Sequence, residues 1–151
     1  MVGIRTATIS DVSGLVRLQL QLRDHHRSLE PSNPRYLVGE AEWERLLRDA
    51  LEHPDTRILV AEEGEIICGF VQLSFVDKPW GKGCEMDTLV VDESQRGKRI
   101  GRELVAAAER YAKDAGAQGI RANVVASNQQ GRSFYEREGY ELIAVRYGKN
   151  L

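Results

Sequence analysis

A cluster of positive charge and glycine stands in the stretch VVDESQRGKRIGREL, residues 90–104. It holds four cations and two glycines within seven residues: Arg96, Gly97, Lys98, Arg99, Gly101 and Arg102. The 151-residue chain carries a formal net charge of −2, so this concentration of positive charge is local. An apolar-periodic run follows at once, which predicts that the cluster lies where a strand ends and a helix begins.

The chemistry that this cluster suits is phosphate binding. A helix N-terminus exposes unpaired backbone N–H groups and a partial positive charge, and glycines let an anion approach the backbone closely. Cations at that end of a helix oppose its dipole by about 0.3–1 kcal/mol each, so four of them favour a bound anion over a merely solvated helix start. The chain has neither the GxxxxGK[ST] P-loop nor a GxGxxG dinucleotide pattern after its first strand.

The elements that must position this cluster follow from hydrophobic periodicity, caps and turn residues. Strands are expected at residues 3–9, 56–63, 65–76, 84–92, 119–127 and 140–147, and helices at about 10–28, 39–53, 98–115 and 128–138. The second helix is expected to bury five residues: Trp43, Leu46, Leu47, Ala50 and Leu51. The resulting order is βααβββαβαβ. The helical crossover between the strands around Val90 and Val124 predicts that these two are parallel, within a mixed, mostly antiparallel α/β (α+β) sheet with helices on both faces.

The bulk properties are those of one globular domain spanning residues 1–151. The near-neutral charge balance argues against a nucleic-acid partner, and no apolar run approaches the length of a membrane span. Cys68 and Cys84 match no metal-binding spacing and are expected to be buried, reduced thiols, and no metal site is expected. Since the N-terminus lacks the apolar segment of a signal peptide, a cytoplasmic location is expected.

Two motifs in this order resemble the GNAT superfamily of N-acetyltransferases. The run Arg96-Gly97-Lys98-Arg99-Ile100-Gly101 resembles the acetyl-CoA signature [QR]-x-x-G-x-[GA], with Arg99 in place of its first glycine. Downstream, Asn128, Tyr135, Gly139 and Tyr140 match the family's second signature, and the element order matches its fold over nearly the whole chain. Arg99 is expected to be helical, because a first-turn residue needs no special dihedral angles.

The resemblance implies a set of residues that bind acetyl-CoA. The backbone of Leu89, Val90 and Val91 would pair with the pantetheine arm, and the amides from Gly97 to Arg102, Ile100 among them, would hold the pyrophosphate beside Arg96. Asn128 would bond the pantetheine region, although a helix N-cap accounts for it equally well. Tyr135 would stand near the thioester sulfur, although a core aromatic with a solvated hydroxyl is the alternative.

An alkyl amine must lose a proton before it can attack a thioester. An alkyl amine has a reference pKa near 10.4, so removing its proton at pH 7 costs about 4.6 kcal/mol. A general base or a desolvating site is therefore needed. Glu85 is the first candidate, because it lies six residues before Val91 on the same strand parity and matches the base glutamate of histone-type members. Asp87 shares that parity and is the second candidate, while a water chain or a solvent-exposed Glu85 stays open.

These features predict acetyl transfer to a primary amine on a small molecule or peptide, by direct attack in a ternary complex. The alternatives are a catalytically silent CoA-binding sensor and a nucleic-acid module that uses the basic cluster. Family resemblance makes a homodimer plausible. Five residues are expected near the acceptor at low odds, with Trp80 as a wall or dimer contact: Asp24, His25, Glu30, Tyr36 and Trp80.

Overall fold

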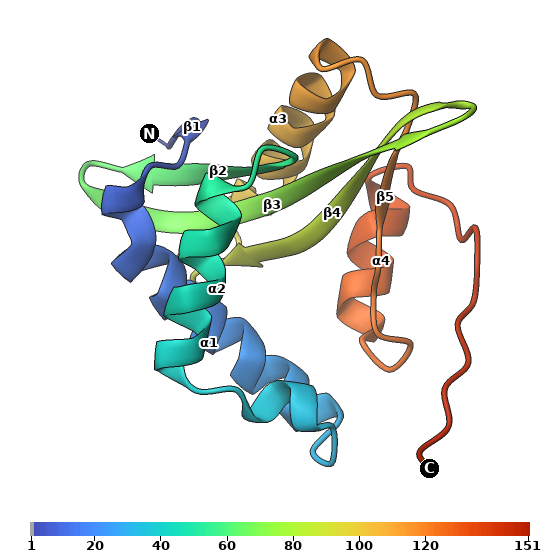
Figure 1. Ribbon diagram of the computed structural model, residues 1–151. Coiled ribbons are helices and arrows are strands. Elements are labelled where there is room, and N and C mark those ends of the chain that lie inside the picture. The colour runs from blue at the N-terminus through green and yellow to red at the C-terminus, as the bar shows by residue number, and fades with distance from the viewer. Residues whose placement is uncertain (1) are drawn as a thin grey trace.

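Residues 2–151 are described by the structure, a computed structural model, and they form one five-stranded sheet (Figure 1). The strands lie in chain order across it: β1 (Gly3–Thr6), β2 (Thr56–Glu63), β3 (Ile66–Lys78), β4 (Gly81–Val91) and β5 (Ile120–Ala122). Neighbours are antiparallel except β4 and β5, which are parallel because α3 (Ile100–Asp114) crosses between them. The predicted mixed, mostly antiparallel sheet is therefore confirmed.

Helices cover both faces of this sheet, as the pattern predicts. On one face α1 (Val12–Leu29) and α2 (Glu40–Glu52) pack against inward side chains of the central strands, among them Val60, Phe70 and Val90. On the other face α3 packs against the alternate positions, among them Val71 and Leu73 (Figure 1). This alternation is the period of two of a strand buried on both faces. The last helix, α4 (Gln129–Arg137), follows β5.

The second helix is less buried than its pattern predicts. Of the five residues expected inside, Leu47 alone is buried, whereas Leu46 remains 38% exposed and Trp43 is half-buried. The third helix behaves as predicted at Ile100, Leu104 and Ala108, which are almost fully buried. α3 therefore anchors its face of the sheet more firmly than α2 anchors the opposite face.

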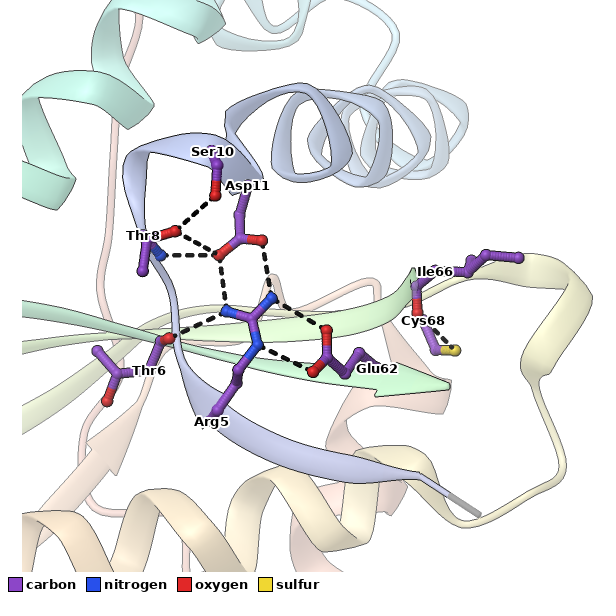
Figure 2. A network of polar contacts seen from close by, with 8 residues as sticks. All are labelled: Arg5, Thr6, Thr8, Ser10, Asp11, Glu62, Ile66 and Cys68. Carbon is purple, nitrogen blue, oxygen red and sulfur yellow. Dashed lines mark hydrogen bonds and ion pairs between the residues drawn. The ribbon is translucent and has the colours of Figure 1, made fainter. Parts of the chain in front are cut away.

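A network of ion pairs ties β1 to α1 and β2 (Figure 2). The guanidinium of Arg5 donates to both carboxylate oxygens of Asp11 at 2.9 Å and to both of Glu62 at 3.0 Å. Asp11 also accepts the backbone N–H of Thr8 at 2.7 Å. These hydrogen bonds, led by the one from Arg5, lower the pKa of Asp11, so the buried carboxylate stays ionised and the first turn of α1 is held against the sheet.

The start of α3 corrects the expectation for Arg99. Arg99 is the N-cap of α3 with φ 62° and ψ 19°, which is the left-handed region, and no other non-glycine residue in 2–151 has a positive φ. The glycine of the family signature is thus replaced at a position whose backbone does favour glycine. A side chain there costs about 1–2 kcal/mol, so the loop stores strain beside the basic cluster.

The chain after α4 corrects the last predicted strand. Residues 141–151 form no strand, and none of their backbone groups hydrogen-bonds within the described chain. Four apolar side chains of this segment are between 66% and 95% exposed: Leu142, Ile143, Val145 and Tyr147. The preceding strand, β5, is also shorter than the expected 119–127. Because no further strand follows it, the outer edge of β5 has no neighbour in residues 2–151. The alternating apolar pattern of 140–147 is real, but the segment pairs with no strand within residues 2–151, although the outer edge of β5 is open.

Replacing Arg99 by glycine should raise the free energy of unfolding by up to about 1 kcal/mol. Relief of about 1–2 kcal/mol of left-handed strain exceeds the roughly 0.4–1 kcal/mol that glycine adds to unfolded-state entropy. Denaturant unfolding followed by circular dichroism measures the change. Lys98→Gly is the matched control, since Lys98 has no positive φ and should only lose stability. A less stable Arg99→Gly protein would contradict the strain assignment.

Candidate functional site

An open backbone edge is the first feature of the candidate site. β4 and β5 pair at three positions, Cys84 with Ile120, Glu85 with Arg121 and Met86 with Ala122, and the pairing then ends. β4 continues to Val91 without a partner on that side. The two parallel strands therefore separate, which leaves the second half of β4 free to pair with an extended ligand.

The peptide groups that face this edge follow from the pairing of β4 with β3. Asp92 donates its N–H to the carbonyl of Cys68 at 2.7 Å, which makes that pair a hydrogen-bonded one. Because such pairs alternate in antiparallel strands, Val90 also bonds across to β3, whereas Leu89 and Val91 direct their N–H and C=O groups to the open edge. Of the three strand residues expected to contact the coenzyme, Leu89 and Val91 thus direct their peptide groups to the open edge, and Val90 directs its own to β3.

The turn that follows β4 presents a second set of unpaired donors. None of the backbone N–H groups from Gly97 to Arg102 finds an acceptor within residues 2–151. A Cβ at Gly101 would lie 3.4 Å from the ring of Phe134 and 3.6 Å from Val91, so the start of α3, the end of β4 and α4 converge here. Unpaired amides at a helix start beside a free strand edge suit a ligand that combines an extended arm with a pyrophosphate.

The four cations of this turn are not equally engaged. Arg102 lies 3.6 Å from the carboxylate of Glu138, and Lys98 donates to the side-chain oxygen of Gln95 at 2.8 Å. Arg96 and Arg99 make no ion pair in the described part of the chain. Two guanidinium groups are therefore available for an anion without breaking an existing contact.

Asn128 caps α4, which confirms one of its two expected roles. Its side-chain oxygen accepts the N–H of Gly131 at 3.0 Å. Glycine at 131 makes this contact possible, because a Cβ there would lie 2.6 Å from the Asn128 amide nitrogen. That amide nitrogen has no acceptor within residues 2–151, so the cap leaves one donor of Asn128 free.

Tyr135 lies in an aromatic group at the core margin. Its ring makes edge contacts with Phe134 at 5.2 Å and Tyr140 at 5.4 Å between centroids. Burial raises the pKa of Tyr135 to about 12, and its hydroxyl has no hydrogen-bond partner among the described residues, whereas Tyr140 donates to Glu109 at 2.9 Å. Tyr135 is therefore a neutral hydroxyl with an unused donor.

A β-bulge at Asp87 corrects the parity argument for the catalytic base. Met86 opposes Leu73 and Thr88 opposes Gln72, so Asp87 is the extra residue of β4. The bulge shifts the alternation by one residue, and Met86 and Val91 consequently share the α3 face. Glu85 lies on the opposite face from Val91, not on the same face as its spacing implies.

The two candidate carboxylates differ in their surroundings. Glu85 is already paired with Arg121, at 2.7 Å between Oε1 and a guanidinium nitrogen. Asp87 has no cationic partner in residues 2–151. Loss of hydration among surrounding protein atoms raises its pKa, the charge of Glu85 adds to this, and a hydrogen bond from Ser74 opposes it. The side chain of Asp87 nevertheless remains exposed, so a substrate can reach it.

The two cysteines offer neither a nucleophile nor, with other side chains of residues 2–151, a metal site. Cys68 and Cys84 are buried free thiols, as expected, and burial raises the pKa of Cys84 to about 11, which makes it a poor nucleophile. Residues 2–151 contain no group of three or more side chains spaced to hold a metal ion. No helix in that range is both long and apolar enough to cross a bilayer.

The expected acceptor-side residues lie in three places. The ring of His25 lies 5.8 Å from that of His26, which in turn lies 5.3 Å from the ring of buried Tyr36, beside Glu30. Asp24 instead pairs with Arg23 and Arg27 on the exposed side of α1. Trp80 stands 74% exposed at the tip of the β3–β4 hairpin, where the sequence places it.

Two features of the site escaped the sequence analysis. Asp92 was counted as the last strand residue, yet it is a buried carboxylate bonded to Arg17 across 75 residues of sequence. Arg121, the partner of Glu85, was an ordinary strand residue by pattern. A charged residue directly after a buried strand was the signal available for Asp92, whereas nothing local marked Arg121.

Comparisons with known proteins agree with this geometry. Residues 20–140 match the model of the acetyltransferase (GNAT) family. The uncharacterised N-acetyltransferase YhfO of Bacillus subtilis (strain 168) is 32% identical over 141 residues, which is 92% of this chain and 89% of that protein. Among solved structures, a tetramutant of the BH1408 protein from Bacillus halodurans superposes with a TM-score of 0.84 at 24% identity over 99% of each chain. Glucosamine-6-phosphate N-acetyltransferase from Arabidopsis thaliana superposes with a TM-score of 0.74 at 23% identity, over 99% of this chain and 98% of that one.

The family model covers well over half of the chain, and YhfO matches nearly all of it above 30% identity. The likeness to solved structures extends the agreement to the whole fold. The chain therefore belongs to the GNAT family and is an acetyl-CoA-dependent N-acetyltransferase.

Proposed function

We propose that one domain, residues 1–151, transfers an acetyl group from acetyl-CoA to a primary amine on a small molecule or a peptide. The amine attacks the thioester carbonyl directly in a ternary complex. The C–N bond forms, the C–S bond breaks, and the amine proton passes to a protein base or to water. The open edge of β4 beside the unpaired amides of α3 is the observation that carries this proposal.

The coenzyme would lie along that edge. Leu89 and Val91 offer peptide groups to the pantetheine arm, and the amides from Gly97 to Arg102 face its pyrophosphate. The free amide nitrogen of Asn128 provides a further donor. The N–H of Val91 would support the acetyl oxygen, where negative charge develops in the transition state.

Asp87 is a better candidate for the base than Glu85. A proton on Glu85 would break its ion pair with Arg121, whereas Asp87 has no such pair to lose. The raised pKa of Asp87 brings its carboxylate closer to the pKa of the amine whose proton it would accept. Asp87 also lies at the bulge, beside the point where the strands separate, and bulges commonly redirect a side chain at active sites.

Tyr135 would stabilise the departing thiolate by a hydrogen bond. Its pKa of about 12 exceeds that of a thiol, near 8.5, so full proton transfer would be uphill by about 5 kcal/mol. A donated hydrogen bond that strengthens as charge develops on sulfur needs no such transfer. Buried Cys84 supplies no alternative nucleophile, which supports direct attack over an acyl-enzyme.

We further propose a homodimer in the cytoplasm. Within residues 2–151 the outer edge of β5 and the apolar segment 141–151 are both unpaired, so two copies would exchange these segments about a two-fold axis. The two buried free thiols are consistent with a reducing compartment. Neither nucleic acid nor membrane has a role in this proposal.

A panel of primary amines tests the function through release of free CoA thiol. At least one amine should give steady acetyl transfer with intersecting initial-rate patterns, which indicate a ternary complex. Tyr135→Phe should lower kcat about 10²-fold at saturating acetyl-CoA, because one transition-state hydrogen bond is lost. Tight CoA binding with no transfer to any amine would instead support a silent sensor.

The pH dependence of Asp87→Asn tests the base. In the wild type, kcat/KM should fall as pH drops through the raised pKa of Asp87, because the carboxylate accepts a proton only when ionised. Asp87→Asn should remove this acidic limb and lower kcat/KM by about 10²–10⁴-fold. Glu85→Gln is the matched control, and its effect should stay below about tenfold. The reverse order of effects would assign the base to Glu85.

The mass of the protein in solution tests the dimer. Sedimentation velocity at micromolar concentration should give twice the chain mass. Ile143→Glu and Val145→Glu should shift the mass to that of one chain, because a charge would be buried in the exchanged strand. Arg146→Glu, on the alternate face of the same segment, should leave the dimer intact. A wild-type monomer at tens of micromolar would contradict the proposal.

A further inference from the structure

The junction between the two halves of the coenzyme site is a single buried carboxylate. Asp92 follows Val91, the last residue of β4, and precedes the short 3-10 helix η3 (Glu93–Gln95) that leads into the basic turn. It is one of three buried polar or charged residues in the described range 2–151, with 8% of its surface exposed. A charge this inaccessible requires partners, and the partners of Asp92 come from a distant helix.

Two side chains of α1, one helical turn apart, hold this junction. Arg17 pairs with Asp92 at 2.5 Å, and its second nitrogen donates to the carbonyl of Ile67 at 2.8 Å. Gln21 donates to the other oxygen of Asp92 at 3.4 Å and accepts the backbone N–H of Glu93 at 3.1 Å. Residues at i and i+4 share one face of a helix, so Arg17 and Gln21 act on the junction together.

The same carboxylate organises the segment that follows it. Asp92 accepts the backbone N–H and the hydroxyl of Ser94, both at 3.1 Å. Its own carbonyl accepts the N–H of Gln95 at 2.9 Å. The side chain of Gln95 in turn accepts from Lys98, inside the basic turn. A continuous series of hydrogen bonds therefore connects α1 with the turn that carries the unpaired amides.

We infer that Arg17 and Gln21 are positioning residues, which fix Asp92 and thereby hold the turn from residue 93 to residue 99 in the conformation that binds the coenzyme pyrophosphate. This inference rests on the proposed coenzyme site and adds a determinant on the opposite face of the sheet. In this proposal neither side chain contacts the coenzyme itself, since both are bonded to Asp92 and to the backbone beside it. We call Arg17, Gln21 and Asp92 the junction clamp.

The clamp is needed because the turn is strained and has little support of its own. Arg99 adopts the left-handed region and Gly97 has φ 85°, with no atom outside the adjoining residues within 4 Å of where its Cβ would be. A strained turn has other conformations of similar energy. The affinity for a ligand is proportional to the fraction of time that the turn spends in the conformation that binds it. Burial opposes ionisation of Asp92, but hydrogen bonds from Arg17, Ser94 and Gln21 lower its pKa to about 2. The clamp is therefore intact throughout the pH range of an enzyme assay.

Calorimetric titration with CoA, combined with steady-state kinetics, tests the clamp. Arg17→Met keeps the apolar stem of the side chain and removes the guanidinium, and Gln21→Leu removes the contact with the Glu93 N–H. Each should raise the dissociation constant of CoA and the KM of acetyl-CoA about tenfold, as expected if the competent turn is populated about a tenth of the time. Because the reacting groups are unchanged, kcat at saturating acetyl-CoA should stay within about threefold. Arg17→Lys, which keeps a charged donor for Asp92, should recover part of the loss.

Arg5→Met is the matched control, because Arg5 holds a comparable ion-pair network and hydrogen-bonds to Thr6, Asp11 and Glu62 but to no residue of the turn (Figure 2). It should lower the melting temperature yet leave the dissociation constant of CoA unchanged. An equal loss of CoA affinity in Arg5→Met would mean that Arg17 and Gln21 act only through the stability of the fold. Unchanged CoA affinity in folded Gln21→Leu and Arg17→Met would refute the clamp. If the wild type itself fails to bind CoA, the proposed coenzyme site fails, which is a separate outcome.

Discussion

The early end of the pairing between β4 and β5 is the constraint on which the rest of the site depends. If the ladder continued past Met86 and Ala122, the outward peptide groups of Leu89 and Val91 would bond to β5 and no edge would remain. Two local features coincide with the end of the ladder. The bulge at Asp87 increases the twist of β4, and the chain after β5 turns away toward the cap formed by Asn128. Backbone groups left unpaired in this way need water or a ligand, and a parallel pair that separates presents them in a row.

The turn before α3 combines two unfavourable features that a bound diphosphate would offset. Positive side chains oppose the helix dipole, and Arg99 adopts a backbone conformation that suits glycine. The buried residues Ile100 and Leu104 hold the helix in place against these costs. Anionic oxygens at the free amides would neutralise the repulsion, so the coenzyme should stabilise the turn more than it stabilises the remainder of the fold.

Hydrophobic periodicity predicted the helices and the central strands well, because both faces of β2 and β3 are buried and the period of two is strong. It failed where partners decide the outcome. The apolar alternation of 140–147 forms a strand only if the segment pairs with another strand, and within residues 2–151 it pairs with none, although the outer edge of β5 is open. The bulge at Asp87 inserts one residue without any change in composition, so the parity of Glu85 could not be read correctly. Motif resemblance located the basic turn, but it could not show that Arg99 takes a left-handed conformation.

Two aspartates five residues apart, Asp87 and Asp92, differ in burial and in the direction in which their pKa is shifted, and so suit different roles. Asp92 is the more buried, and burial by itself would favour its neutral form, yet the guanidinium of Arg17 and the donors of Gln21 and Ser94 keep it ionised. Asp87 is exposed and has no cation beside it, so lost hydration and the charge of Glu85 raise its pKa instead. A carboxylate locked as an anion is suited to holding backbone, whereas one with a raised pKa and access to solvent is suited to accepting a proton. The bulge places the two side chains in different surroundings. Asp87 lies beside Glu85 and Ser74, whereas Asp92 stands at the end of β4, where it caps η3.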